Sequence, residues 1–105
     1  MYSMDNLKQL PRFAELAKEA TEAFWAYDKT AFADGAIPRK YKELMAVAVA
    51  LTTQCAYCLE THRQSAHNAG ATEQELIEAV HLAGAVRAGG AITHGTHLLR
   101  ADPAE

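Results

Sequence analysis

From Arg39 to His62 the chain reads RKYKELMAVAVALTTQCAYCLETH. Pro38, directly before this segment, suits the first turn of a helix. The run after Met45 is apolar on every side up to Leu51, which is typical of a deeply buried helix. The valines of this run would also suit a strand, but its alanines and the absence of flanking hairpin signals favour a helix. The polar segment Thr52–Gln54 then predicts a break or a kink.

Helical periodicity extends to both sides of this segment. Between Pro11 and Ala31, apolar residues recur at steps of three and four, which predicts one amphipathic helix with Gly35 as its C-terminal stop. A third helix is expected from Cys55 to Asn68, ending near Gly70.

The last third of the chain begins with a helix-start signal. Thr72 and Glu75 have the spacing of a capping box, in which Thr72 caps the helix and Glu75 reaches back. Glycines then weaken the helix and predict a kink, a break or close packing against another helix. A final helical piece is expected from Ala91 to Leu99, and the tail from Ala101 to Glu105 is expected to fray. The apolar stripe comprises Leu76, Ile77, Val80, Ala83 and Val86, and the glycines are Gly84, Gly89 and Gly90.

Length and composition indicate the class of fold. The 105 residues suit one domain over residues 1–105, and 50% of them are hydrophobic, many being alanine. We therefore expect an all-α, single-domain fold of about five to six helices. A chain this short with so much apolar surface is expected to hide part of it in a homo-oligomer.

The charge and the apolar segments argue against nucleic-acid binding, secretion and insertion into a membrane. The formal net charge is −3, and no cluster of Lys and Arg occurs, which argues against binding of nucleic acid. The N-terminus has no basic segment followed by an apolar run, so it is not a secretory signal. The most apolar stretch, Leu44–Leu51, is too short to span a bilayer. We expect a cytoplasmic protein without a membrane partner.

The two cysteines and one histidine form the candidate site. On a helix, at about 100° per residue, Cys55, Cys58 and His62 lie within about 60° of one another. The same spacing brings the two cysteine Cα atoms to roughly 5 Å, which a disulfide can bridge. A pair this close closes no long loop, so it favours redox or metal chemistry over structural cross-linking. A helix N-terminus near Gln54, or the imidazole of His62, would favour the reactive thiolate.

Two other uses of these residues stay open. The cysteines can be ordinary small core residues, and His62 a structural histidine. The order Cys-x-x-Cys-x-x-x-His also supplies three metal ligands, although zinc wants a fourth and no second Cys/His pair follows at zinc-finger spacing. Leu59 stands where a c-type haem site has its histidine, which excludes that site in its usual form.

Glu43, eleven residues and then Cys-x-x-Cys-x-x-x-His together resemble the signature of the AhpD-like alkylhydroperoxidase branch of the carboxymuconolactone decarboxylase family. The resemblance runs from about Pro38 to Val80, and it includes the Asn68–Ala71 turn and the acidic helix start at Thr72. It implies an all-helical fold that assembles as trimers or hexamers. It also implies peroxidase or disulfide-reductase chemistry without haem, flavin, metal or any other cofactor.

The resemblance implies a role for each site residue. Cys58 would attack the hydroperoxide substrate as a thiolate. Cys55 would resolve the product and exchange with a dithiol reductant, such as a lipoylated or thioredoxin-like protein. His62 and Glu43 would form a proton relay. The best-characterised members carry a second histidine just before the second cysteine, where this chain has Tyr57. The relay is then one group short, which favours thiol–disulfide exchange over strong peroxidase activity.

Spacing alone does not bring Glu43 to the sulfurs. Twelve residues of straight helix would carry it about 18 Å from Cys55. It reaches them only if the chain kinks or reverses near Thr52–Gln54, or if another subunit supplies it. Without either, a glutamate in the first turn of a helix is usually solvated.

Two other functions are alternatives to a thiol peroxidase. Decarboxylation of a muconolactone-type acid, as in the founding branch of the family, has no need for two thiols. A redox-sensing or purely structural helical oligomer would bury its cysteines and leave them slow to react.

Other residues attract weaker hypotheses. His94 and His97 lie on one face if helical; they could bind a metal, but an exposed face is the simpler interpretation. Arg87 suits an ion pair across an interface. Three aromatic residues look like core or interface residues: Phe24, Trp25 and Tyr27.

Overall fold

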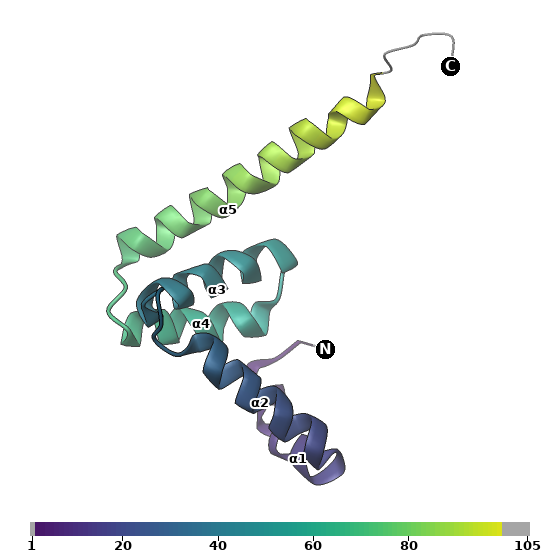
Figure 1. Ribbon diagram of the computed structural model, residues 1–105, viewed down its shortest axis with the longest axis vertical. Helices are drawn as coiled ribbons and strands as arrows, with labels where there is room; N and C mark the ends of the chain where they lie inside the picture. Colours follow the sequence, from purple (N-terminus) through teal and green to yellow (C-terminus); the bar gives the residue numbers. More distant parts are fainter. Residues whose placement is uncertain (1, 100–105) are drawn as a thin grey trace.

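The structure is a computed structural model that describes residues 2–99, and these form helices joined by short turns (Figure 1). No strand occurs in this part of the chain, so the expected all-α fold is confirmed. The tail from Ala101 to Glu105 lies outside the described residues. In chain order the helices are η1 (Met4–Gln9), α1 (Pro11–Leu16), α2 (Lys18–Phe32), α3 (Arg39–Thr53), α4 (Ala56–Asn68), α5 (Glu73–His94) and η2 (Gly95–Leu98).

Helix α3 is the centre of the molecule, because α4 packs along one side of it and α5 along another (Figure 1). Its buried residues, Glu43, Val47 and Ala50, recur at steps of four and three and so share one stripe. The other buried apolar residues are alanines, and Glu43 is the largest side chain that is fully buried among residues 2–99. The core is therefore small, and a carboxylic acid lies inside it. The remaining buried alanines are Ala66, Ala71 and Ala83.

The break expected at Thr52–Gln54 is confirmed as a full reversal of the chain. Gln54 ends α3 in the left-handed conformation, with φ 57° and ψ 39°, a geometry typical of helix C-termini. The Cys55 N–H donates to the Ala50 carbonyl at 3.0 Å and closes the turn. Helix α4 then runs back alongside α3, as Figure 1 shows.

The single helix predicted between Pro11 and Ala31 is wrong, because the chain breaks at Ala17. This residue has φ −148° and ψ 71°, and it separates α1 from α2. The break lets α1 fold against the first half of α2, where the Thr21 hydroxyl donates to the Phe13 carbonyl at 3.1 Å. The residues around Ala17 all favour helices, so packing between the two halves decides the break.

Helix α5 is longer and straighter than the glycines predict. It begins with the expected capping box, in which Thr72 Oγ1 accepts from the Glu75 N–H at 3.1 Å and Glu75 Oε1 accepts from the Thr72 N–H at 2.9 Å. It then continues without a break through all three glycines to His94 and leads directly into η2, so the helical structure expected from Ala91 to Leu99 is confirmed as far as Leu98 but is not a separate piece. A continuous ladder of backbone hydrogen bonds outweighs the low helix propensity of single glycines.

The far half of α5 projects away from the other helices (Figure 1). Val86 is 65% exposed and Ile92 is 76% exposed. The radius of gyration is 18.5 Å, whereas a compact domain of this length has about 13 Å. The chain thus presents apolar helix surface that its own core does not cover. No helix among residues 2–99 has the length and apolar character needed to cross a membrane.

Two polar contacts fasten α5 to α3. The Lys40 ammonium pairs with the Glu75 carboxylate at 2.8 Å, and the Arg87 guanidinium donates to the Thr52 carbonyl at 2.9 Å. Arg87 thus bonds a carbonyl of its own chain, and its ion pair across an interface stays a prediction. The hydrogen bond between Lys40 and Glu75 is the main cause that lowers the pKa of Glu75 and raises the pKa of Lys40.

Glu75→Gln is expected to lower the free energy of unfolding at neutral pH, because glutamine keeps the capping bond to Thr72 but loses the ion pair with Lys40. The pKa of Glu75 is lower in the folded chain than its ordinary 4.5. This stabilisation is therefore complete above pH 4.5 and is lost as the pH falls through the folded pKa. Urea unfolding followed by circular dichroism, at neutral pH and at about pH 3, measures the difference.

Glu78→Gln makes the same change in charge one turn further along α5 and is the control. The prediction would be contradicted if both variants lowered the free energy of unfolding equally at neutral pH. A Glu75→Gln difference that persists at about pH 3 would also contradict it.

Candidate active site

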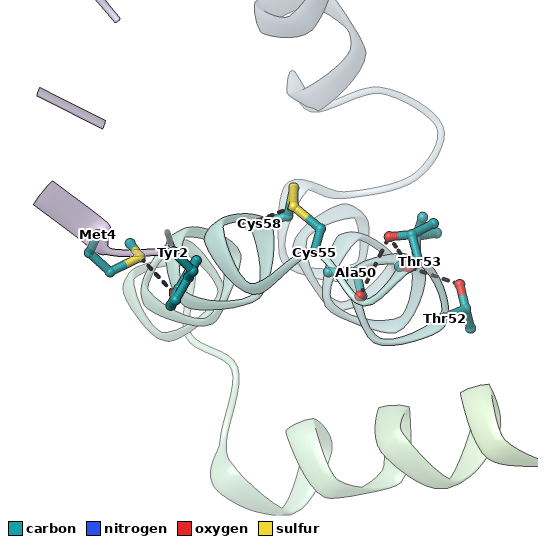
Figure 2. The surroundings of a disulfide bond; sticks show 8 residues. Tyr2, Met4, Ala50, Thr52, Thr53, Cys55 and Cys58 are labelled. Carbon is teal, nitrogen blue, oxygen red and sulfur yellow. Dashed lines mark hydrogen bonds between the residues drawn. A yellow bond between two sulfur atoms is a disulfide. The ribbon is translucent and has the colours of Figure 1, made fainter. Parts of the chain in front are cut away.

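Cys55 and Cys58 form a disulfide at the start of α4 (Figure 2). Cys55 is the N-cap of this helix, and its Sγ accepts a hydrogen bond from the Cys58 N–H at 3.2 Å. The helix begins at Ala56, one residue later than expected, yet the two cysteine Cα atoms lie 5.3 Å apart as the spacing predicts. Unsatisfied N–H groups at a helix N-terminus carry partial positive charge, which stabilises a thiolate when the pair is reduced. Cys58 is exposed and Cys55 is half-buried.

His62 lies one turn beyond Cys58, and its Nδ1 forms a 2.8 Å hydrogen bond with Oε2 of Glu43. Glu43 is only 1% exposed, and its other carboxylate oxygen lies 3.6 Å from Nε of Arg39. A carboxylate only accepts, so Nδ1 of His62 is the donor and Nε2 remains to take or give a proton. Phe32 stacks on the imidazole, with ring centroids 4.8 Å apart and planes 7° apart. The ring is thus fixed on two sides.

The chain reversal at Gln54 brings Glu43 to this site, whereas a straight helix would carry it about 18 Å from Cys55. A second contact has the same register. Ala50 lies seven positions after Glu43, Cys55 lies seven positions before His62, and these two residues share a backbone hydrogen bond. The two helices therefore run antiparallel in a fixed register. Cys58, four residues before His62, lies level with the position four residues after Glu43. One contact between helices thus determines where the sulfurs stand.

An apolar cleft of about 480 Å³ lies beside Cys58 and His62, within the size range of small-molecule sites. Residues of α2, α3 and α4 form its walls. Lys42 adds a cation to a lining that is otherwise mostly apolar. The cleft is open to solvent and gives a small molecule direct access to the Cys58 side of the disulfide. Its apolar lining includes Phe32, Ile37, Met45, Ala46 and Val49.

Tyr57, which replaces the second histidine of the resembled signature, faces the N-terminal segment. Its hydroxyl accepts a 2.8 Å hydrogen bond from Nδ2 of Asn6, and its ring packs against Tyr2 with centroids 4.6 Å apart. Tyr2 therefore lies beside Tyr57, and its hydroxyl donates to Sδ of Met4 at 3.2 Å, a bond that Figure 2 draws. Tyr57 therefore anchors η1 to the helix that carries the cysteines.

Sequence reasoning missed two members of this site. Arg39 stands four residues before Glu43, a spacing that signals a helical ion pair and could have been recognised. Phe32 gave no such signal, because its contact with His62 depends on how α2 meets α4. Phe24, Trp25 and Tyr27 are exposed, so they do not belong to the core of this chain.

The pair of histidines considered as a metal site, His94 and His97, lies at the C-terminal end of α5 and in η2. The rings of His94 and His97 are 4.9 Å apart, and both residues are exposed. Within residues 2–99, no three side chains of His, Cys, Asp or Glu gather as a possible metal site.

Comparisons with known proteins relate this arrangement to one family. The family model described as carboxymuconolactone decarboxylase matches residues 18–101. The chain is 45% identical to uncharacterised protein 4 of the cox locus of Paracoccus denitrificans over 78 residues, 74% of this chain and 70% of that protein. It is 34% identical to an uncharacterised protein of Cupriavidus necator over 71 residues, 68% of this chain and 63% of that protein.

Two solved structures share the fold. The crystal structure of an apo carboxymuconolactone decarboxylase family protein from Legionella pneumophila matches with a TM-score of 0.76 and 32% identity, over 88% of this chain and 82% of that one. A protein from Methanobacterium thermoautotrophicum matches with a TM-score of 0.78 and 32% identity, over 84% of this chain and 99% of that one.

Proposed function

Since the chain belongs to the carboxymuconolactone decarboxylase family, we propose that it is a cofactor-free thiol peroxidase of the AhpD-like branch of that family. One observation carries the proposal. The paired cysteines at the start of α4 lie one turn from His62, whose ring is held by buried Glu43, and Cys58 and His62 line the same cleft. A nucleophile (Cys58), a base (His62) and a group that orients the base (Glu43) thus lie next to one another in space.

The reaction begins with the reduced pair. The Cys58 thiolate attacks the distal oxygen of a hydroperoxide, the O–O bond breaks, and Cys58 becomes a sulfenic acid while an alcohol leaves. The Cys55 thiol then condenses with the sulfenic acid, which forms the disulfide and releases water. Two thiols are oxidised and one hydroperoxide is reduced by two electrons. A dithiol protein, lipoylated or thioredoxin-like, returns both electrons by thiol–disulfide exchange.

His62 moves the protons of this sequence. Its free Nε2 takes the proton of the Cys58 thiol and later gives it to the departing alkoxide, so the imidazole ends as it began. Glu43 keeps the ring in the required tautomer and stabilises the imidazolium. Tyr57, at the position of the second histidine in the resembled signature, contacts Asn6 and Tyr2 in the N-terminal segment, so we assign only His62 and Glu43 to the relay. We therefore expect exchange with the dithiol protein to be faster than the reduction of peroxide.

Decarboxylation of a muconolactone-type acid is the runner-up. It is compatible with the family, but it leaves the paired thiols and their helix N-terminus without a use. We place the thiol chemistry in the cytoplasm, where dithiol reductants keep such a pair supplied with electrons.

We also propose that the protein works as a homo-oligomer, a trimer or a hexamer. The radius of gyration of 18.5 Å and the exposed apolar residues of α2 and α5 support this proposal. Burial against other copies of the chain would remove that surface from water. It would also support the far half of α5, whose glycines have open space around them.

Cys58→Ser is expected to abolish peroxide consumption, because serine does not form the nucleophilic thiolate. Cys55→Ser is expected to allow one turnover and then stop, with Cys58 left as a sulfenic acid. Mixing the reduced protein with alkyl hydroperoxide in a stopped-flow instrument, and then counting remaining thiols, measures both. Unchanged peroxide consumption by Cys58→Ser would refute the peroxidase and favour the thiol-independent rival.

Glu43→Gln is expected to slow peroxide reduction by about 10- to 100-fold, because a neutral amide no longer stabilises the His62 imidazolium. The side chain keeps its volume and can still accept from Nδ1. Glu60→Gln on the exposed face of α4 changes the charge equally and is the control. The relay would be disproved by equal rates for the two variants at equal fractions of folded protein.

Sedimentation equilibrium at micromolar concentration is expected to give a mass of three or six chains. Ile92→Glu, in the projecting half of α5, is expected to shift the distribution toward smaller species, because it places a charge in an apolar interface. A monomer in the unaltered protein would contradict the oligomer and leave the exposed surface unexplained.

A further inference from the structure

Building on the peroxidase proposed above, we infer that the substrate is a fatty-acid hydroperoxide with the peroxide group in mid-chain. In this arrangement the Lys42 ammonium binds the carboxylate of the fatty acid, and the Cys58 thiolate attacks its peroxide group. Lys42 then acts as a determinant of substrate specificity and takes no part in the chemistry.

The shape of the cleft gives the first argument. Its α3 wall is one stripe, since Lys42, Ala46, Val49 and Thr53 recur at steps of three and four. The ends of this stripe are eleven positions apart in the sequence, which corresponds to about 16 Å along the helix. An elongated apolar groove of this kind fits an acyl chain better than a compact lactone acid.

The register of α3 and α4 gives the second argument. Glu43 pairs with His62 and Ala50 contacts Cys55, so Cys58 lies level with Val47. That level is about 8 Å along the axis from Lys42 and about 9 Å from Thr53. Apolar groove therefore extends on both sides of the sulfur. A substrate that fills it carries its peroxide within the chain and not at either end.

Charge gives the third argument. Nζ of Lys42 donates to the Ala33 carbonyl at 2.6 Å, which holds the ammonium at the end of α2. An ammonium has three donors, so two remain for a ligand. Lys42 forms no ion pair with a carboxylate in the part of the chain that the structure describes. The adjacent carboxylate of Glu43 bonds His62 and lies beside Arg39, and Asp34, next to Ala33 in the sequence, accepts from the Arg39 N–H at 2.7 Å. The cation at this end of the cleft is thus available to an anion.

The test compares linoleic acid hydroperoxide with its methyl ester, which differ only in the charge of the head group. The unaltered protein is expected to favour the acid by about tenfold in kcat/KM, the effect of one charge-assisted hydrogen bond. Lys42→Met should reduce this preference to about one, while Lys42→Arg should keep it. Lys18→Met, an equal change in charge at the opposite end of α2, should leave the preference intact.

A binding measurement separates this inference from the peroxidase itself. Decanoate is expected to bind the oxidised protein saturably in a calorimetric titration, and Lys42→Met should weaken it about tenfold. If hydroperoxides are not consumed but decanoate binds through Lys42, the peroxidase fails and the anion site stands. If acid and ester react alike, or if decanoate does not bind because a second copy of the chain fills the cleft, the inference is overturned.

Discussion

The hydrogen bond between His62 and Glu43 is the contact on which the rest of the structure depends. It joins α3 to α4, and its acceptor, the Glu43 carboxylate, belongs to a residue that is only 1% exposed. Removing a carboxylate from water is costly, and only a well-placed donor offsets that cost. The buried apolar residues around it are mostly alanines, whose small side chains allow several alignments of α3 and α4. The polar pair accepts one alignment only, and it thereby fixes the position of Cys58.

The same arrangement divides the chain into two regions with different physical character. Helices α2, α3 and α4 line the cleft beside Cys58 and His62, so one chain holds all the residues of the candidate site. The far half of α5 contributes nothing to that site and exposes apolar surface. In the homo-oligomer that we propose, the subunits would therefore associate through α5 without sharing residues of the candidate site. Tyr57 fits this division, because its contacts with Asn6 and Tyr2 tie the N-terminal segment to α4.

Features with a local cause were predictable. Pro38 before α3 and the capping box of Thr72 and Glu75 act within one turn, and the structure has both helix starts where the sequence puts them. The break after α3 was predictable from polar residues, but its sharpness was not, because Gln54 gives no glycine-like signal for a left-handed conformation. The break at Ala17 had no local signal at all. The glycines of α5 do not break the helix, because the low helix propensity of single residues counts for little beside a continuous ladder of hydrogen bonds.

The sequence by itself determined the helical class of the protein, the starts of α3 and α5 and the close spacing of Cys55, Cys58 and His62. Each of these follows from a pattern among residues that are near one another in the sequence. Only the tertiary structure decided that Glu43 reaches His62, that Phe32 covers the imidazole and that Lys42 stands beside the same cleft. Those contacts join residues from different helices, and their geometry depends on a chain reversal and a packing register that no single helix contains.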